Sequence, residues 1–496
     1  MRVRSCWLPA ALLAALTGAG ALAQDFPYLL VSDFNNDVVR RYDANTGAFV
    51  DVFIPTGSGD SLVNGPQGLA IGPDGDVYVG MLYSSVTGNT GIGRINRYNG
   101  RTGAFVSTFF GGNLNRVYGM TFGPDGKLYV SSAQNHRILR YDTLTGTSEI
   151  VAEGGFTGQV FAVPHAMTFD ANGNLYFSCV NGGSFPFHRV LKITANQLAG
   201  PLPVTPTIFI EGVSLPLNSP PQDNRLAGPR GLLFGPDANN DGTPDLYVLS
   251  RGGANTYTGA IVNAVLRYDG LTGAYIDTFV PSGSGGLNVP LDLKYGPDNN
   301  LYITHSGTPT SANGVYRYNG TTGDFLDTFV INPAAGLNGP TFMAFQPRVV
   351  LLSGVLQLQG RTSASVPTLI TFQPAGGGVP FSKFVTPQAS GALAVTILPG
   401  AYYVKVKPRY YLAKVFSGEV SSDLSGLDLG EFLAGDANDD NAVDVLDLSI
   451  LIEAFDAGLG DPNWNPGADF NNDGGVDVFD LDLLISNFDA VGDELP

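Results

Sequence analysis

Acidic and amide side chains recur at regular intervals in two short segments near the end of the chain. Each segment carries them at positions 1, 3, 5, 9 and 12 of a loop. They are Asp436, Asn438, Asp440, Asp444 and Asp447, and then Asp469, Asn471, Asp473, Asp477 and Asp480. Oxygen donors at alternate positions of a tight turn converge on one point, where position 7 adds a main-chain carbonyl, and calcium prefers such hard ligands. With Ala442 and Gly475 at position 7, the spacing predicts two calcium sites.

The residues that follow these ligands predict a loop and a helix, twice. Position 6 of such a loop needs a sharp turn, which Gly474 supplies in the second loop and Asn441 in the first. We therefore expect the first loop to bind calcium slightly more weakly. Apolar residues then recur at helical spacing, and each helix is expected to offer one apolar face to its twin. These residues are Leu448, Leu451, Ile452 and Phe455, and then Leu481, Leu484, Ile485 and Phe488.

The paired loops and helices resemble a type I dockerin, a C-terminal α-helical domain with paired EF-hand-like loops, over residues 434–496. The resemblance implies calcium as the bound metal and a cohesin-like or other protein as the partner. In cellulosomal dockerins, loop positions 10 and 11 contact the cohesin and often carry small or hydroxyl residues. Here they form the apolar pairs Val445-Leu446 and Val478-Phe479. The resemblance assigns these four residues to the docking face, although apolar residues stand here where the family often has small or hydroxyl residues.

A third acidic pattern lies in the middle of the chain. Asp237, Asn239, Asp241 and Asp245 repeat the alternation, with Gly242 at the turn. A clear twelfth ligand is missing. The pattern fits either a further calcium site or a solvated turn.

One motif recurs six times between Pro27 and Arg348, and the first copy is incomplete. Each copy contains an apolar strand, a Gly-Pro-Asp type of turn, a strand centred on Tyr, a strand that ends in Arg-Tyr, and a fourth strand. Four antiparallel strands at intervals of roughly 50 residues match a propeller blade, which buries its apolar faces only against neighbouring blades. The ring must close, so we expect the lone strand at 340–345 to join the first copy and complete six blades.

The third copy shows the repeat most fully. It contains Gly123-Pro-Asp-Gly126, Leu128-Tyr-Val130 and Asn135-His-Arg-Ile138. Residues 24–348 resemble NHL-repeat six-bladed propellers in these motifs. The resemblance implies a fold and not one activity, because such rings include scaffolds, ligand binders and lyases.

In propellers of this type, the residue beside the first strand of each blade faces the channel mouth. These channel-lining positions hold Gln67, Tyr118, His165, Arg230, Leu291 and Thr341. His165 and Arg230 would suit a general acid/base step with anion stabilisation, as in propeller lyases. Calcium-dependent lactonases of similar shape need acidic ligands at the channel, and none of Glu149, Glu153 and Glu211 occupies such a position. We assign no catalytic residue.

Residues 349–433 lack the repeat and contain short strands such as 393–397 and 402–407. The turn Leu398-Pro-Gly-Ala-Tyr402 between them resembles the small carboxypeptidase-regulatory or transthyretin-like sandwiches. The expected fold is therefore mainly β: a six-bladed propeller, a small β-sandwich and an α-helical calcium-binding tail.

Charge and the N-terminus limit the classes of function. The formal net charge is −18, which repels phosphate backbones and argues against a nucleic-acid partner. Residues 1–23 have the basic start, short apolar run and small-residue ending of a secretory signal peptide. No later stretch reaches the length of a transmembrane anchor. We expect a secreted protein that is extracellular, periplasmic or at the cell surface.

Three functions are compatible with this organisation. In the first, the propeller binds an unknown ligand or partner without catalysis, and the calcium-loaded tail docks the protein in an extracellular assembly. A link to polysaccharide breakdown is expected because dockerin-like tails often accompany carbohydrate-active modules. In the second, the ring is a lyase or a polysaccharide-acting hydrolase. In the third, the tail binds calcium for stability alone.

Overall fold

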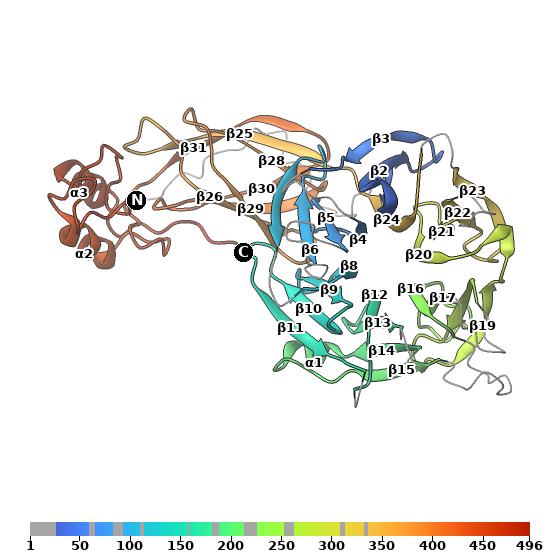
Figure 1. Ribbon diagram of the computed structural model, residues 1–496. Helices are drawn as coiled ribbons and strands as arrows, with labels where there is room; N and C mark the ends of the chain where they lie inside the picture. Colours follow the sequence, from blue (N-terminus) through green and yellow to red (C-terminus); the bar gives the residue numbers. More distant parts are fainter. Residues whose placement is uncertain are drawn as a thin grey trace. The chain divides into compact units, whose positions relative to one another are not determined.

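The structure is a computed structural model that describes residues 26–58, 65–82, 93–109, 114–156, 159–180, 188–212, 226–251, 262–307, 313–331 and 336–496. The expected signal peptide at 1–23 lies outside these residues. The described chain forms two compact units, one within Asp25–Pro347 and one within Arg348–Pro496 (Figure 1).

The first unit contains six antiparallel four-stranded sheets in its described part. The first sheet combines β1 (Tyr28–Asp33), β2 (Val38–Asp43) and β3 (Phe49–Ile54) with β24 (Pro340–Gln346), and the second consists of β4 (Pro66–Ile71), β5 (Val77–Met81), β6 (Arg94–Tyr98) and β7 (Phe105–Phe109). The third consists of β8 (Val117–Phe122), β9 (Leu128–Ser132), β10 (Arg137–Tyr141) and β11 (Ser148–Glu153), and the fourth of β12 (Pro164–Phe169), β13 (Leu175–Cys179), β14 (Arg189–Ile193) and β15 (Thr207–Glu211). The fifth consists of β16 (Pro229–Gly235), β17 (Asp245–Ser250), β18 (Ala264–Tyr268) and β19 (Tyr275–Val280). The sixth is β20 (Pro290–Tyr295), β21 (Leu301–His305), β22 (Gly314–Tyr318) and β23 (Phe325–Ile331). Short helical elements are η1 (Phe34–Asn36), α1 (Ala195–Ala199) and η2 (Ser284–Gly286).

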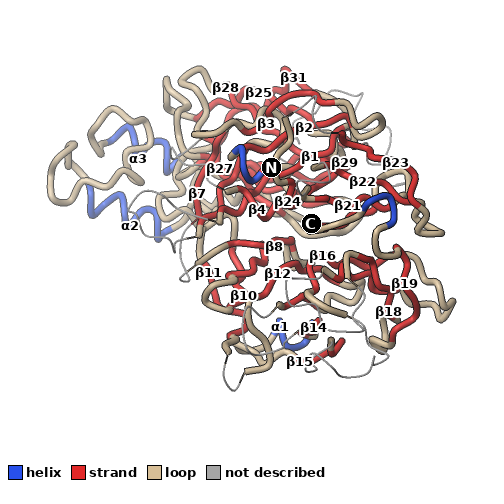
Figure 2. The backbone as a smooth tube through the Cα atoms, turned by 45° about the vertical axis from the view of Figure 1, so that its right-hand side comes forward, coloured by secondary structure: helices blue, strands red, loops and turns tan. Residues whose placement is uncertain are grey.

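The sheets follow one another around a ring (Figure 1), and Figure 2 shows that strands make up most of the regular structure of the unit. The first strands of neighbouring sheets contact each other in the order β24, β4, β8, β12, β16, β20 and back to β24. The predicted pairing of the last strand with the first copy is confirmed, since β24 pairs antiparallel with β1 and places Ala344 opposite Leu30. The unit is therefore propeller-like, with four-stranded sheets consistent with blades.

The repeated residues have repeated structural roles. In the second strand of a sheet, the Tyr is buried, as in Tyr78, whose hydroxyl donates to Asp74 in the preceding turn at 3.2 Å. The Arg of Arg-Tyr pairs with an acid on the fourth strand in four of the described sheets, as Arg267 Nε does with Asp277 at 3.1 Å, whereas Arg97 pairs with Asp76 in the turn before β5 at 2.8 Å. The following Tyr268 is fully buried. The motif thus pairs a cation with an acid within each of these sheets and buries the aromatic ring beside it.

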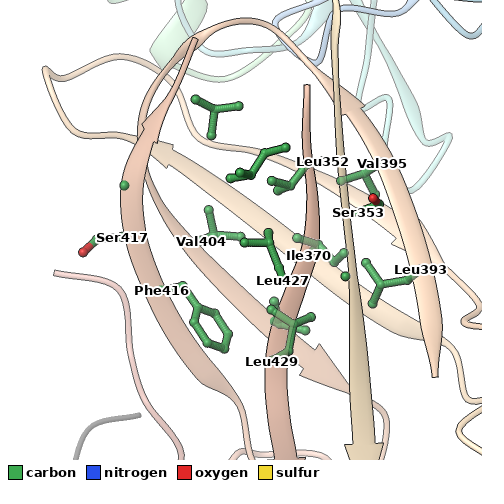
Figure 3. Close-up of a pocket in the computed structure, with 15 residues that line it drawn as sticks. Leu352, Ser353, Ile370, Leu393, Val395, Val404, Phe416, Ser417, Leu427 and Leu429 are labelled. Atoms are coloured by element: carbon green, nitrogen blue, oxygen red, sulfur yellow. The ribbon is translucent and has the colours of Figure 1, made fainter. Parts of the chain in front are cut away.

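The second unit contains two further sheets and two helices. One sheet has the order β28 (Ala392–Ile397), β25 (Val350–Leu358) and β31 (Leu424–Phe432), and the other has the order β27 (Phe381–Val385), β26 (Thr368–Pro374), β29 (Gly400–Pro408) and β30 (Lys414–Val420). Apolar side chains of both sheets, including Leu352, Ile370 and Val404, point toward one another around a small cavity of about 50 Å³ (Figure 3). The helices are α2 (Val445–Ala454) and α3 (Val478–Ser486).

The helices and the two sheets share one hydrophobic core. Leu451 and Leu484 are fully buried in the same cluster as Phe432 and Val350. The expected apolar face is corrected at three positions, because Ile452, Ile485 and Phe488 are exposed. The sheet residues cover Leu451 and Leu484, and the next residue on each helix is therefore turned to solvent. None of the helices in the described ranges has both the length and the apolar character needed to cross a membrane.

Candidate calcium loops and central cavity

The two acidic loops of the tail have the same internal hydrogen bonds. In the first, the amide of Asn441 donates to Asp436 at 3.0 Å, and the amide of Asp440 donates to Asn438 Oδ1 at 2.9 Å. Asp469, Asn471, Asp473 and Gly474 repeat these contacts at 3.1 and 2.8 Å. Both position 6 residues are left-handed, with φ of 75° at Asn441 and 93° at Gly474. Asn therefore replaces Gly here without changing the path of the loop.

The helix that follows each loop places the last two candidate ligands. Asp444 and Asp477 are the N-caps of α2 and α3, and each accepts the amide of the residue two positions later. Asp447 reaches back from the first turn of α2 and accepts the amides of Asn438 at 3.1 Å and Asp444 at 2.8 Å. Asp480 does the same in the second loop. The residue at position 12 of each loop thus accepts hydrogen bonds from the amides of positions 3 and 9, and these contacts hold the predicted ligands of the loop close together.

Burial of the carboxylates tests whether the loops suit calcium. Asp436, Asp447 and Asp480 are fully buried and Asp469 nearly so. Burial raises the pKa of all four carboxyl groups above their usual value, although hydrogen bonds from main-chain amides oppose this shift. The Oδ1 atom of Asp436 is buried without a hydrogen-bond partner. Buried carboxylates with unused oxygens are costly unless a cation binds them, so the donor set fits calcium.

Carboxylates alone do not supply all the calcium ligands of either loop. In the described part of the chain, no three Asp, Glu, His or Cys side chains converge closely enough to hold a metal by themselves. The amide oxygens of Asn438 and Asn471 and the carbonyls of Ala442 and Gly475 would supply the remaining ligands, as oxygen-rich calcium loops require. Calcium would neutralise the clustered acids and hold loop and helix together.

A lysine of β29 and an arginine that follows β25 make the loops unequal. Lys407 of β29 pairs with Asp436 at 2.8 Å. Arg361 instead donates to the main-chain carbonyls of Phe470 at 2.8 Å and Asp469 at 3.0 Å. Lys407 therefore occupies an oxygen of the first ligand in loop 1, whereas Arg361 supports the backbone of loop 2. This difference, which is not visible in the loop sequences, adds to that between Asn441 and Gly474.

We expect Lys407→Gln to raise the calcium affinity of loop 1 by about tenfold, because one charge-assisted hydrogen bond no longer competes for Asp436. The affinity of loop 2 should not change. Calcium titration calorimetry of the full chain measures both sites. Lys405→Gln is the matched control, since Lys405 pairs with the exposed Glu494 at 2.6 Å. Equal affinities in Lys407→Gln and the unsubstituted chain would contradict the assignment.

The four residues of the expected docking face lie at the first two positions of the helices. Val445, Leu446, Val478 and Phe479 are 57–66% exposed. Exposed apolar side chains of this size, grouped in duplicate, are typical of a protein-binding surface. Ile452 and Ile485, which helical spacing alone assigned to the interior, add to the exposed apolar residues of the two helices.

The acidic loop of the first unit has the hydrogen bonds of the tail loops. The amides of Asp241 and Gly242 donate to Asp237 at 3.3 and 2.8 Å, and the amide of Asp241 also donates to Asn239 at 3.0 Å. Asp245 begins β17 and is fully buried, and its Oδ1 atom has no hydrogen-bond partner. Burial raises the pKa of Asp245, and the nearby Asp237 and Asp241 act in the same direction. The loop thus shares both the contacts and the unused buried oxygen of loop 1.

The six expected channel-lining residues surround one cavity of about 290 Å³ in the first unit. Arg251 and Ser306 also line it. The sequence analysis missed these two residues because each follows a second strand, β17 or β21, whereas the six expected residues lie at the start of a first strand. Their position, one residue after the end of those strands, is the sequence feature that could have identified them as cavity-lining residues.

His165 lies between the ring of Tyr118 and the guanidinium of Arg230. Its ring stacks on Tyr118 with centroids 4.2 Å apart, and its Nε2 atom lies 3.0 Å from Nη1 of Arg230. Burial lowers the pKa of His165 well below its usual value, and Arg230 and Arg251 lower it further. A neutral imidazole whose Nε2 accepts from Arg230 is poorly suited to donate a proton.

Comparison with known proteins identifies the tail. Residues 434–489 match the dockerin type I domain family. A comparison with curated proteins finds no match to the chain. The tail is thus a dockerin type I domain, a class of calcium-binding domain, and this supports calcium as its metal.

Solved structures similar to the chain include a nidogen/laminin complex, with 18% identity, a TM-score of 0.44, and coverage of 64% of this chain and 97% of that one. A streptogramin B lyase has 18% identity and a TM-score of 0.36, and the match covers 56% of this chain and 73% of the lyase chain. A type II cohesin–X-dockerin complex from Acetivibrio cellulolyticus has 20% identity, a TM-score of 0.25, and coverage of 29% and 97%.

Proposed function

We propose that this chain is an exported calcium-binding docking protein. In this proposal residues 24–348 form a six-bladed NHL-like propeller that binds a ligand or partner, and 349–433 form a β-sandwich. Residues 434–496 dock the protein to a cohesin-like partner in an extracellular or cell-surface assembly, with a link to polysaccharide breakdown. The dockerin type I match supports docking.

One observation carries the proposal: the exposed apolar pairs Val445-Leu446 and Val478-Phe479 each follow directly on a loop with buried carboxylates. Because the N-cap of each helix is also a candidate calcium ligand, the ion would set the orientation of the pair beside it. A surface ordered in this way binds without the entropic cost of folding on contact.

The shared core gives the docking surface a rigid base. The hydroxyl of Tyr411 donates to the carbonyl of Phe470 at 2.8 Å, and Asn487 donates to Gln359 at 2.6 Å. These contacts join the sheets to loop 2 and to the end of α3. We therefore propose that the sandwich and the dockerin domain act as one binding element.

Binding of the full chain to isolated type I and type II cohesin domains, with calcium and with chelator, tests this function. Calcium-dependent binding to either type supports docking. If neither type binds in calcium while the chain remains folded, the docking proposal is wrong.

The alternative, a propeller lyase or hydrolase, is not favoured by the geometry around His165. Its Nε2 atom contacts Arg230, and none of the cavity-lining residues in the described ranges is acidic. A ligand-binding role for the ring uses the same cavity without requiring a proton donor.

We also propose that Asp237, Asn239, Asp241 and Asp245 hold a calcium ion in the ring, on the evidence of the unused buried oxygen of Asp245. Asp241→Ala should reduce the calcium stoichiometry of the full chain by one ion, because Asp241 is an exposed member of the set whose loss spares the core. Equilibrium dialysis with metal analysis measures this. Asp324→Ala, at another exposed turn, should leave the stoichiometry unchanged. Equal stoichiometry in Asp241→Ala and the unsubstituted chain would rule out the ring site.

A further inference from the structure

The central cavity contains two arginines without an acidic partner. Arg230, the residue after the start of β16, places Nη1 near His165 Nε2, and its Nε atom is buried without a hydrogen-bond partner. Arg251 follows β17 and lines the same cavity, and no ion pair involves its side chain among the described residues. The side chains come from one sheet and converge on one space.

Other arginines of the ring show the contrast. Arg267 and Arg317 each pair with an aspartate on the neighbouring strand, Asp277 and Asp327. The buried carboxylate of Asp292, next to the cavity residue Leu291, accepts the amide of Met343 at 3.1 Å and the ammonium of Lys294 at 3.3 Å. In the described ranges, the cavity is thus lined by two guanidinium groups and by no carboxylate.

This arrangement is electrostatically unfavourable in the absence of a ligand. Burial, followed by the nearby charge of Arg251, lowers the pKa of Arg230 to about 9. Arginine side chains stay protonated at neutral pH in proteins, and burial together with the two arginines lowers the pKa of His165 well below its usual value. Buried cations without counter-charges destabilise a fold, and an anion placed between them would relieve both the desolvation and the repulsion.

We propose that the cavity binds a small anionic ligand, which carries a carboxylate, phosphate or sulfate group, between Arg230 and Arg251. A planar guanidinium presents paired N–H donors that match such groups. The stacked rings of Tyr118 and His165, together with Phe34, provide apolar surface for the body of an organic anion. The volume of about 290 Å³ lies at the lower end of the range of ligand sites, which suits a molecule of monosaccharide size. This inference rests on the proposed ligand-binding role of the ring.

Thermal unfolding and calorimetric titration of the full chain in chloride buffer test the site with galacturonate, glucose 6-phosphate and inorganic phosphate. Galactose and glucose are the neutral controls. We expect both sugar anions to bind and to raise the unfolding temperature, and the neutral sugars to do neither. Inorganic phosphate binding as tightly as glucose 6-phosphate would show that the site recognises the free ion, whereas weaker binding would show that the organic body contributes.

Arg230→Met should weaken binding of the sugar anions by about tenfold or more. It should also raise the unfolding temperature without anion, because a half-buried charge without an acidic partner is removed. A purely structural arginine would lower it. Arg251→Gln provides a second variant at the rim of the same cavity with the same expected loss of binding. Arg267→Met is the matched control, and should lower stability while keeping anion binding.

The proposal is overturned if neither sugar anion binds the unsubstituted chain, or if both cavity variants bind as it does. Cohesin binding measured on the same samples separates this result from failure of the docking function, because the two rest on different units of the chain.

Discussion

Removing calcium from the full chain should lower the unfolding temperature of the Arg348–Pro496 unit by roughly 15 °C or more. Each tail loop contributes about 4 kcal/mol when calcium exceeds its dissociation constant a thousandfold. Without the ion, the carboxylates of Asp436, Asp447, Asp469 and Asp480 are buried and their pKa values are raised, and among them Asp436 has a direct ion pair, with Lys407. Differential scanning calorimetry with calcium and with chelator measures the effect.

The loss should extend beyond the dockerin domain. Leu484 and Phe470 belong to the same core as the strands, so disorder in the loops exposes apolar residues of both sheets. We expect one cooperative transition for the unit, shifted as a whole. A magnesium-containing sample is the control, because magnesium demands a smaller octahedral shell and keeps its waters. An unfolding temperature that is the same in calcium and in chelator would remove the basis for calcium-dependent docking.

The double substitution Leu446→Asp and Phe479→Asp should weaken cohesin binding by at least about a hundredfold, since central apolar contacts of an interface each contribute about 2 kcal/mol or more. Both side chains are largely exposed. The free energy of unfolding should therefore change by less than about 0.5 kcal/mol. Surface plasmon resonance against an immobilised cohesin domain measures binding, and denaturant unfolding measures stability.

Leu459→Asp is the matched control for this surface. Leu459 is 74% exposed and lies in the connection between α2 and α3. The substitution adds one negative charge outside the docking face and should leave binding unchanged. If the control weakens binding as much as the double variant does, general charge repulsion and not the four-residue face explains the result.

The local patterns of this chain determined much of its structure. The spacing of oxygen ligands predicted loops whose hydrogen bonds are the same in both copies, and the lone strand at 340–345 predicted the pairing of β24 with β1. Both follow from short-range geometry: a tight turn brings alternate oxygens together, and a repeat that buries its faces only against neighbours must close. The six expected channel residues lie around one cavity for the same reason.

Only the tertiary structure decided which side of each helix is covered and where the charges meet. Helical periodicity marks Leu451 and Ile452 equally as apolar, but the sheets of the same unit bury the first and leave the second in solvent. The contact of Lys407 with Asp436 joins residues from a strand and a loop that share no motif. Arg251 enters the cavity from the end of β17, outside the repeat's marked position. A sequence pattern specifies the local conformation of a segment, whereas burial and ion pairing depend on which distant segment packs against it.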